Sequence, residues 1–157
     1  MFVAEACCSS YGVVVLFGKR KRIVNKILIV EDEPLTAFDN EMMLSDAGYE
    51  VVATVDRFRE AIENLDAHCV DLILSDVRLR GERTGIELAD EARRRGVPIL
   101  FVTGFPPDNA AELAIGCLLK PYSGRKLKAA LDAVDRYLSG EKVRPPHGLT
   151  LFPEAKI

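Results

Sequence analysis

Near its start the chain reads KILIVEDEP over residues 26–34. The apolar, β-branched run from Lys26 to Val30 predicts a buried strand. Pro34 suits the first position of a helix, because its missing N–H would have no partner there. Three acidic residues therefore fall between a buried strand and a helix, at the point where the strand ends.

The same alternation of strand and helix continues down the chain. Further strands are expected at residues 51–55, 70–74, 98–102 and 114–119, and helices at residues 34–47, 57–65, 85–95, 108–113 and 123–138. In the first helix Leu35, Phe38, Met42 and Met43 share one face. Strict alternation implies right-handed crossovers and a parallel sheet covered on both faces. We therefore predict an α/β fold with a doubly wound, five-stranded, flavodoxin-like (βα)5 sheet, whose strand order 2-1-3-4-5 is taken from known sheets of this type.

The regular pattern occupies residues 25–139, a length that suits one domain. Residues 1–24 form an N-terminal extension, either a disordered tail or sequence upstream of the true translation start. Residues 140–157 contain three prolines and little periodicity, so we expect a C-terminal tail there. Little chain remains after residue 139 for an output domain.

Composition and charge narrow the class of protein. The formal net charge is -3, so no nucleic-acid partner is expected, since phosphate backbones call for a basic face. The longest apolar run, residues 13–17, is far shorter than the roughly 20 residues of a membrane-spanning helix. The chain lacks the basic start of a signal peptide, and its four cysteines form no C-x-x-C pair. We therefore expect a cytoplasmic protein with no membrane partner.

Polar side chains follow four of the five predicted strands. Glu31 and Asp32 follow the first, Asp76 the third, Thr103 the fourth and Lys120 the fifth. Carboxylates that are brought together repel one another unless a cation joins them. Mg²⁺ prefers oxygen ligands and keeps several waters, which leaves room for phosphate oxygens. We predict Asp32 and Asp76 as direct ligands, and Glu31 as acting mainly through a metal-bound water.

The same residues suit phosphoryl transfer. A carboxylate such as Asp76 can attack phosphorus and form an aspartyl phosphate. The oxygens of the transferred group must be neutralised and held in place. Mg²⁺ would take one oxygen, the Lys120 ammonium a second, and the Thr103 hydroxyl with backbone N–H groups near Val77 and Gly104 the third.

These motifs resemble the response-regulator receiver domains of two-component systems. The resemblance covers residues 25–138 and rests on residues 29–34, 74–76, 102–104 and 119–122. It implies that Asp76 is the phosphoacceptor and that Glu31 and Asp32 are the acidic metal pair. It also implies that the backbone carbonyl of Arg78 is a third protein ligand of Mg²⁺, that Thr103 and Lys120 read out the phosphoryl group, and that the bond before Pro121 is cis.

A narrower likeness is to the stand-alone "FAT GUY" receivers. It rests on residues 101–105, which read FVTGF, and on the loop 78–82. The resemblance implies a sensor histidine kinase, often of the HWE type, or a histidine phosphotransferase as phosphodonor. Because only about 19 residues follow Leu138, we expect no DNA-binding output domain, and we expect output through a downstream protein partner or by removal of phosphate from a shared kinase.

One departure from the family concerns signal readout. Ordinary receivers carry a Tyr or Phe three residues before the lysine, where this chain has Cys117. Phe105 or Tyr122 is a candidate to take over that role, and it is equally open that both rings only fill space around a short fourth helix.

Two other functions remain open at this stage. A phosphate-independent adaptor would not need the intact set Asp76, Thr103 and Lys120. A Mg²⁺-dependent phosphatase of this fold normally has a second Asp two residues after its nucleophile, where this chain has Arg78, which cannot act as the acid. We therefore expect no enzyme activity beyond self-catalysed phosphotransfer and slow loss of the protein's own phosphoryl group.

Overall fold

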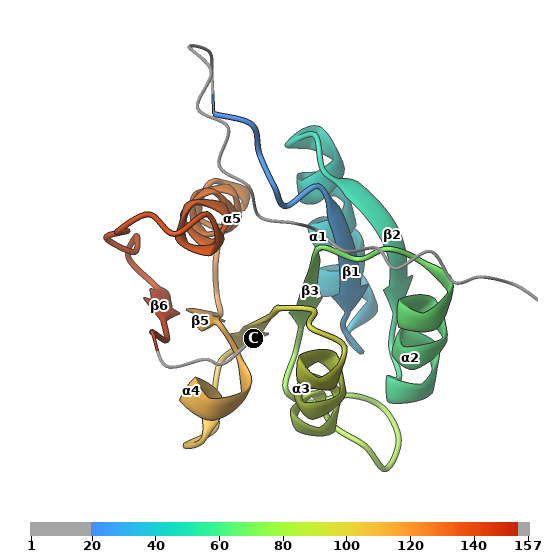
Figure 1. Cartoon of the computed structure of the whole chain (residues 1–157). Coiled ribbons are helices and arrows are strands. Elements are labelled where there is room, and N and C mark those ends of the chain that lie inside the picture. The colour runs from blue at the N-terminus through green and yellow to red at the C-terminus, as the bar shows by residue number, and fades with distance from the viewer. Residues whose placement is uncertain (1–19, 154–157) are drawn as a thin grey trace, which may run out of the picture.

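The computed structural model describes residues 20–153, which contain a six-stranded sheet in the order β2-β1-β3-β4-β5-β6 (Figure 1). The strands are β1 (Lys26–Val30), β2 (Glu50–Val55), β3 (Leu72–Ser75), β4 (Ile99–Thr103), β5 (Gly116–Leu119) and β6 (Leu149–Leu151). The first five strands are parallel, and β6 runs antiparallel to β5. The predicted α/β fold and its 2-1-3-4-5 order are confirmed, and β6 extends the sheet at the β5 edge.

In the described part of the chain, five helices cover the sheet on both faces (Figure 1). They are α1 (Pro34–Asp46), α2 (Phe58–Ala67), α3 (Gly85–Arg94), α4 (Ala110–Leu113) and α5 (Gly124–Leu138). Helices α1 and α5 lie on one face, and α2, α3 and α4 on the other. The expected short fourth helix is a single turn of four residues. Every predicted element is present, with ends that differ by at most about two residues.

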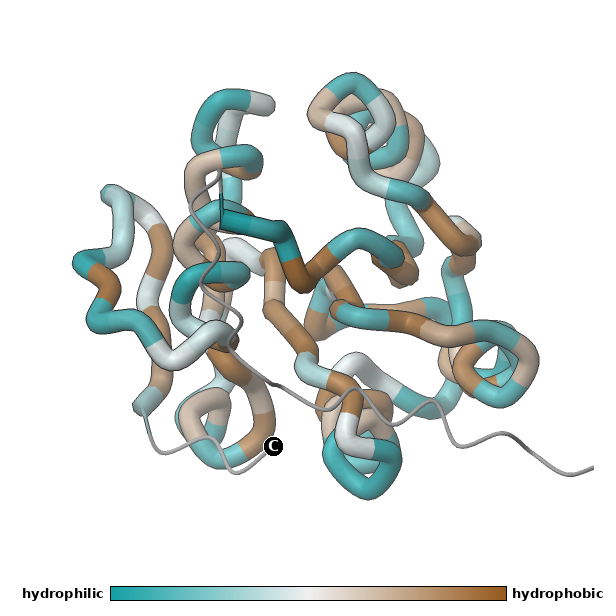
Figure 2. The backbone as a smooth tube through the Cα atoms, turned by 45° about the horizontal axis from the view of Figure 1, so that its top comes forward, coloured by the Kyte–Doolittle hydropathy of each residue, from teal (hydrophilic) through white to brown (hydrophobic). Residues whose placement is uncertain are grey.

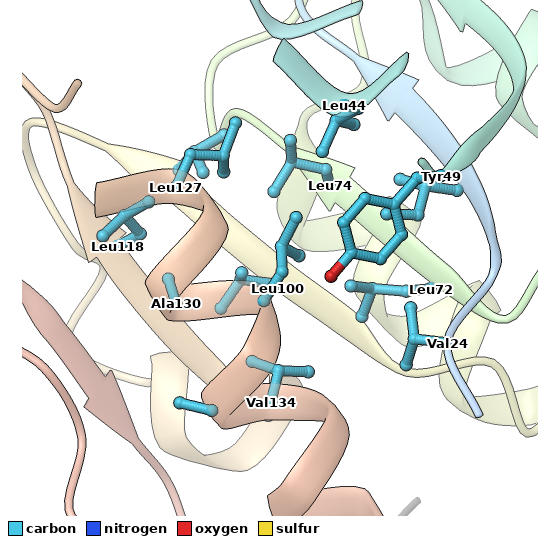
Figure 3. Packing of buried hydrophobic residues seen from close by; sticks show 14 of the residues in the cluster. Val24, Leu44, Tyr49, Leu72, Leu74, Leu100, Leu118, Leu127, Ala130 and Val134 are labelled. Carbon is cyan, nitrogen blue, oxygen red and sulfur yellow. The ribbon is translucent and has the colours of Figure 1, made fainter. Parts of the chain in front are cut away.

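Two apolar clusters lie on the two sides of the sheet. One packs α1 and α5 against alternate strand residues, among them Leu72, Leu74 and Leu100 (Figure 3). The other packs α2, α3 and α4 against the intervening residues, such as Leu28 and Phe101. Figure 2 shows the resulting concentration of apolar residues in the central strands. Because each central strand is buried on both faces, its sequence is a continuous apolar run instead of an alternating one.

Of the four residues predicted to share the apolar face of α1, only Met43 packs against the core. Leu35, Phe38 and Met42 are exposed by 75%, 61% and 49%. The buried residues of α1 are Ala37, Asn40 and Leu44. The prediction of one shared apolar face was therefore wrong: three of its residues are turned to solvent, and Met43 is turned to the core. We call Leu35, Phe38 and Met42 the α1 stripe.

The two segments outside the predicted domain contribute to the fold where the structure describes them. In the predicted C-terminal tail, β6 adds three residues to the sheet. In the predicted N-terminal extension, Arg20, Ile23 and Val24 contact Asp135 of α5, and Val24 is buried. The rest of that extension, residues 1–19, lies outside the described residues. None of the helices within 20–153 is both long and apolar enough to span a bilayer.

Asp135 of α5 anchors the N-terminal segment. Its carboxylate is 1% exposed and accepts hydrogen bonds from the backbone N–H groups of Ile23 and Val24, both at 2.8 Å. The Arg20 guanidinium forms an ion pair with the other carboxylate oxygen. A buried carboxylate is stable when it is paired and hydrogen-bonded in this way, so Asp135 ties the chain before β1 to the last helix.

Candidate functional site

Five polar side chains gather at the carboxyl ends of the central strands. Glu31 and Asp32 follow β1, Asp76 follows β3, Thr103 ends β4 and Lys120 follows β5. Parallel strands bring these ends to one edge of the sheet, beside the point where the strand order reverses. The backbone ties them together, since the Asp76 N–H donates to Val30 O at 2.9 Å and the Lys120 N–H to Thr103 O at 3.0 Å.

Three carboxylates form the acidic part of the site. Oxygens of Glu31, Asp32 and Asp76 all lie within 4.8 Å of one another, and within residues 20–153 they make up the one group of this kind. An all-oxygen set fits a hard cation such as Mg²⁺ better than zinc or copper, which favour nitrogen and sulfur ligands. The three carboxylates predicted as metal ligands therefore lie where they could hold one ion.

Lys120 supplies the positive charge of the site. Its Nζ lies 2.7 Å from Glu31 Oε2 and 2.8 Å from Asp76 Oδ2. Burial alone would lower the pKa of Lys120, but the hydrogen bonds to Asp76 and Glu31 outweigh it and raise the pKa above its usual value. The side chain therefore stays charged and bridges β5 to the ends of β1 and β3.

Glu31 is the most deeply buried acid of the three, at 2% exposure. Burial raises the pKa of its carboxyl group, although the hydrogen bond and charge of Lys120 oppose that effect. Its second oxygen, Oε1, accepts the Glu33 N–H at 3.2 Å. Glu31 thus already has partners from the chain itself, which agrees with an indirect role toward a metal.

The remaining predicted residues lie around Asp76. The Arg78 N–H donates to Asp76 Oδ1 at 3.2 Å, so the loop after β3 curls over this carboxylate. The Thr103 hydroxyl is buried and accepts the Phe105 N–H at 3.2 Å. The Arg78 guanidinium lies 5.5 Å from the centre of the exposed Phe105 ring, so the loops after β3 and β4 meet above the site.

The two candidates for the missing aromatic switch lie in different settings. Phe105 is 76% exposed and points away from the core. Tyr122 is partly buried, and its hydroxyl donates to Asn40 Oδ1 at 2.9 Å. Burial raises the pKa of Tyr122 to about 12, so it remains a neutral donor. At the usual switch position Cys117 is buried, and the Lys120–Pro121 bond is cis.

Gly85 supports the site and was missed in the sequence analysis. A Cβ atom at this position would lie 2.2 Å from the backbone oxygen of Asp76 and 3.0 Å from Val77 Cα. The glycine therefore lets the start of α3 approach the phosphoacceptor loop closely. The capping box of Thr84 and Glu87 holds this helix start, with the Thr84 N–H donating to Glu87 Oε2 at 2.8 Å. The T-x-x-E pattern was readable in the sequence, but the close approach to Asp76 was not.

Known proteins resemble the chain along most of this fold. The family model described as "Response regulator receiver domain" matches residues 27–132. The transcriptional regulatory protein PdtaR of Mycobacterium tuberculosis (strain H37Rv) is 35% identical over 122 residues, which cover 73% of this chain and 59% of PdtaR.

Two solved structures show the same arrangement of strands and helices. The response regulator PhyR of Brucella abortus superposes with a TM-score of 0.64 at 26% identity, covering 76% of this chain and 51% of the PhyR chain. The chemotaxis response regulator CheY4 of Vibrio cholerae gives a TM-score of 0.63 at 30% identity, covering 71% of this chain and 98% of CheY4. The chain thus spans nearly all of CheY4, and only part of PdtaR and PhyR.

Proposed function

Because the chain belongs to the response regulator receiver domain family, we propose that it accepts a phosphoryl group on Asp76 from a phosphohistidine donor and acts as a signalling switch. One observation carries the proposal: the Lys120 ammonium bridges Glu31 and Asp76 beside a cluster of three carboxylates. A structural ion pair would need one acid, whereas a phosphoryl site needs a nucleophile, a cation-binding pair and a fixed positive charge.

The chemistry uses the chain's own residues in defined roles. An oxygen of Asp76 forms the new P–O bond while the P–N bond of the donor breaks, and its electron pair stays on the imidazole nitrogen. Lys120 is held beside Asp76 and would neutralise one oxygen of the transferred group. The buried Thr103 hydroxyl would donate to another oxygen once its own proton turns toward the site.

Mg²⁺ is the metal that these residues fit. Asp32 and Asp76 would bind it directly, with the backbone carbonyl of Arg78, and Glu31 would act through a bound water. When bound, the ion supplies positive charge that offsets the carboxylates and the incoming phosphoryl oxygens. The chain's contribution is to hold these acids within one small volume before the donor arrives.

The α1 stripe is the surface we assign to the phosphodonor. Leu35, Phe38 and Met42 are exposed apolar residues on the helix that follows Glu31 and Asp32 directly. Exposed apolar groups that lie together on one element are typical of a protein contact. A sensor histidine kinase, of the HWE type or another, or a histidine phosphotransferase that packed there would place its phosphohistidine near Asp76. We propose the cytoplasm as the site of transfer and a protein as the downstream partner.

Phosphorylation by a small donor tests the proposal directly. Incubation of the protein with acetyl phosphate and Mg²⁺ should add one phosphoryl group, seen as an increase in intact mass. Removing the metal with EDTA should reduce labelling to background, because the clustered carboxylates would then repel the anionic donor. Peptide mapping should place the modification on Asp76.

Two results would contradict the proposal. Labelling that survives EDTA would show that the three carboxylates do not act through a cation. No labelling with any donor in a panel of histidine kinases and phosphotransferases would favour a phosphate-independent adaptor.

The α1 stripe allows a second prediction. Replacing Phe38 by alanine should slow transfer from the donor that labels the wild type fastest by about tenfold, since losing a central aromatic contact commonly costs about 1.4 kcal/mol or more. Labelling by acetyl phosphate should be unchanged, because that donor needs no docking surface. The control is Leu119→Ala, which truncates another exposed apolar residue, on β5. Equal slowing in both variants would argue against docking at α1.

A further inference from the structure

The β5 edge of the sheet is closed by the chain's own C-terminal segment. Strand β6 pairs with β5 in antiparallel register, with Leu118 opposite Leu149 and Gly116 opposite Leu151. Backbone hydrogen bonds extend the pairing at both ends: the Leu119 N–H donates to Gly148 O and the Phe152 N–H to Ile115 O, each at 2.9 Å. An edge strand that lacked this cover would present unpaired N–H and C=O groups to solvent.

Side-chain packing and a hydrogen bond also hold residues 149–152 beside β5. Leu149 is buried and joins the cluster under α5, whereas Phe152 packs against the cluster on the opposite side of the sheet. Tyr137 of α5 donates its hydroxyl to Phe152 O at 3.3 Å. A Cβ at Gly116 would lie 2.5 Å from the Thr150 backbone oxygen, so only glycine lets β6 approach this closely. These features indicate that the β6 segment is specifically packed against β5 and is not a loosely attached tail.

The same strand leads directly into the phosphorylation site. Consecutive N–H groups at the end of β5 point to different neighbours: Leu119 donates to Gly148 beside β6, and Lys120 donates to Thr103 at the end of β4. The Lys120 ammonium contacts Asp76. Any movement of Lys120 and Thr103 toward a phosphoryl group on Asp76 therefore pulls on a backbone that is hydrogen-bonded to the β6 segment.

The aromatic side chain that transmits such a movement in ordinary receivers is absent from this chain. Position 117 holds a cysteine instead of an aromatic ring, and Tyr122 is held by its hydrogen bond to Asn40. Helix α4 is a single turn, which offers little surface to shift. By contrast, β6 is three residues long and lies at the sheet edge, where local opening requires few contacts to break.

We propose that β6 is the switch element of this receiver: it covers the β5 edge in the unphosphorylated protein and is released when Asp76 carries a phosphoryl group. This inference rests on the proposed function. Release exposes the unpaired edge of β5 together with the apolar residues that β6 covers. The phosphoryl group favours release because Lys120 and Thr103 bind it better when β5 can move away from Gly148.

Hydrogen exchange measured by mass spectrometry tests the proposal on the full chain. The protein is compared without additions and with Mg²⁺ and beryllofluoride, a stable analogue of the phosphoryl group. Amides of residues 149–152 should exchange about tenfold faster in the loaded state, as a coupling of roughly 1.4 kcal/mol implies. Amides of β2, the strand at the other edge of the sheet, should not change.

A variant of the contact gives an independent readout. In Gly116→Ala the added methyl group displaces β6, so its amides should exchange fast in both states. Because coupling is reciprocal, this variant should also bind beryllofluoride more tightly, by about tenfold. Phe152→Ala adds no atom to β5 and should also speed exchange of the β6 amides and tighten binding of beryllofluoride. It replaces Gly116→Ala in the experiment if that variant does not fold. The exposed Thr150 provides the control, and Thr150→Ala should respond like the wild type.

The outcomes separate the inference from the function on which it rests. If acetyl phosphate labels Asp76 but exchange at residues 149–152 is the same with and without beryllofluoride, the role of β6 alone is overturned. Failure of acetyl phosphate and of every histidine donor to modify Asp76 overturns both. Faster exchange that spreads equally to β2 reports general loosening and also overturns the role of β6.

Discussion

Replacing Asp76 by asparagine is expected to abolish labelling by acetyl phosphate and by every histidine donor. The amide is a poor nucleophile, so no P–O bond forms, and it lacks the charge that helps to hold a metal. Lys120 would keep its contact with Glu31 at 2.7 Å, so the substitution should leave the domain folded. Intact-mass spectrometry after incubation with Mg²⁺ and donor measures the effect, and circular dichroism checks the fold.

Asp108→Asn is the matched control for this substitution. Asp108 is an exposed aspartate in the loop between β4 and α4, outside the carboxylate cluster. Its variant should label like the wild type. If Asp76→Asn were still labelled and the label disappeared when another carboxylate was replaced, that other residue would be the phosphoacceptor. The assignment of the site to Asp76 would then be wrong.

The second large effect is expected on stability, from Asp135→Ala. The substitution removes the acceptor of two backbone N–H groups, those of Ile23 and Val24, and the ion-pair partner of Arg20. Each buried group left unpaired costs about 1–3 kcal/mol, so we expect a loss of about 3 kcal/mol in the free energy of unfolding. For a domain of this size that corresponds to a decrease of roughly 10 °C in Tm.

Two further variants make the cause of this loss identifiable. Asp132→Ala removes a carboxylate from the same helix, but that group is exposed and forms a surface ion pair with Lys128, so its loss should change stability by less than about 0.5 kcal/mol. Asp135→Asn keeps an oxygen acceptor for the backbone and should lie between wild type and alanine. Equal melting temperatures for Asp135→Ala and Asp132→Ala would show that residues 20–24 are not anchored through Asp135.

The central fold and the main site residues could be read from the sequence because both depend on local patterns. Each strand is a continuous apolar run, such as residues 26–30, and each is followed by a helix with its own periodicity. The polar residues Asp76, Thr103 and Lys120 stand immediately after such runs. A parallel sheet then brings the ends of all its strands to one edge, so the topology places these residues together without further information.

Other features depend on contacts between distant segments, and only the tertiary structure decided them. The α1 stripe has the spacing of a core face, yet it is exposed because no other element within residues 20–153 packs on it. Strand β6 has no strong pattern of its own, and it becomes a strand because the edge of β5 supplies its hydrogen bonds. Gly85 and Asp135 owe their roles to atoms that approach them from other segments of the chain. Periodicity describes a single element, and the neighbours that cover or approach that element are set by packing.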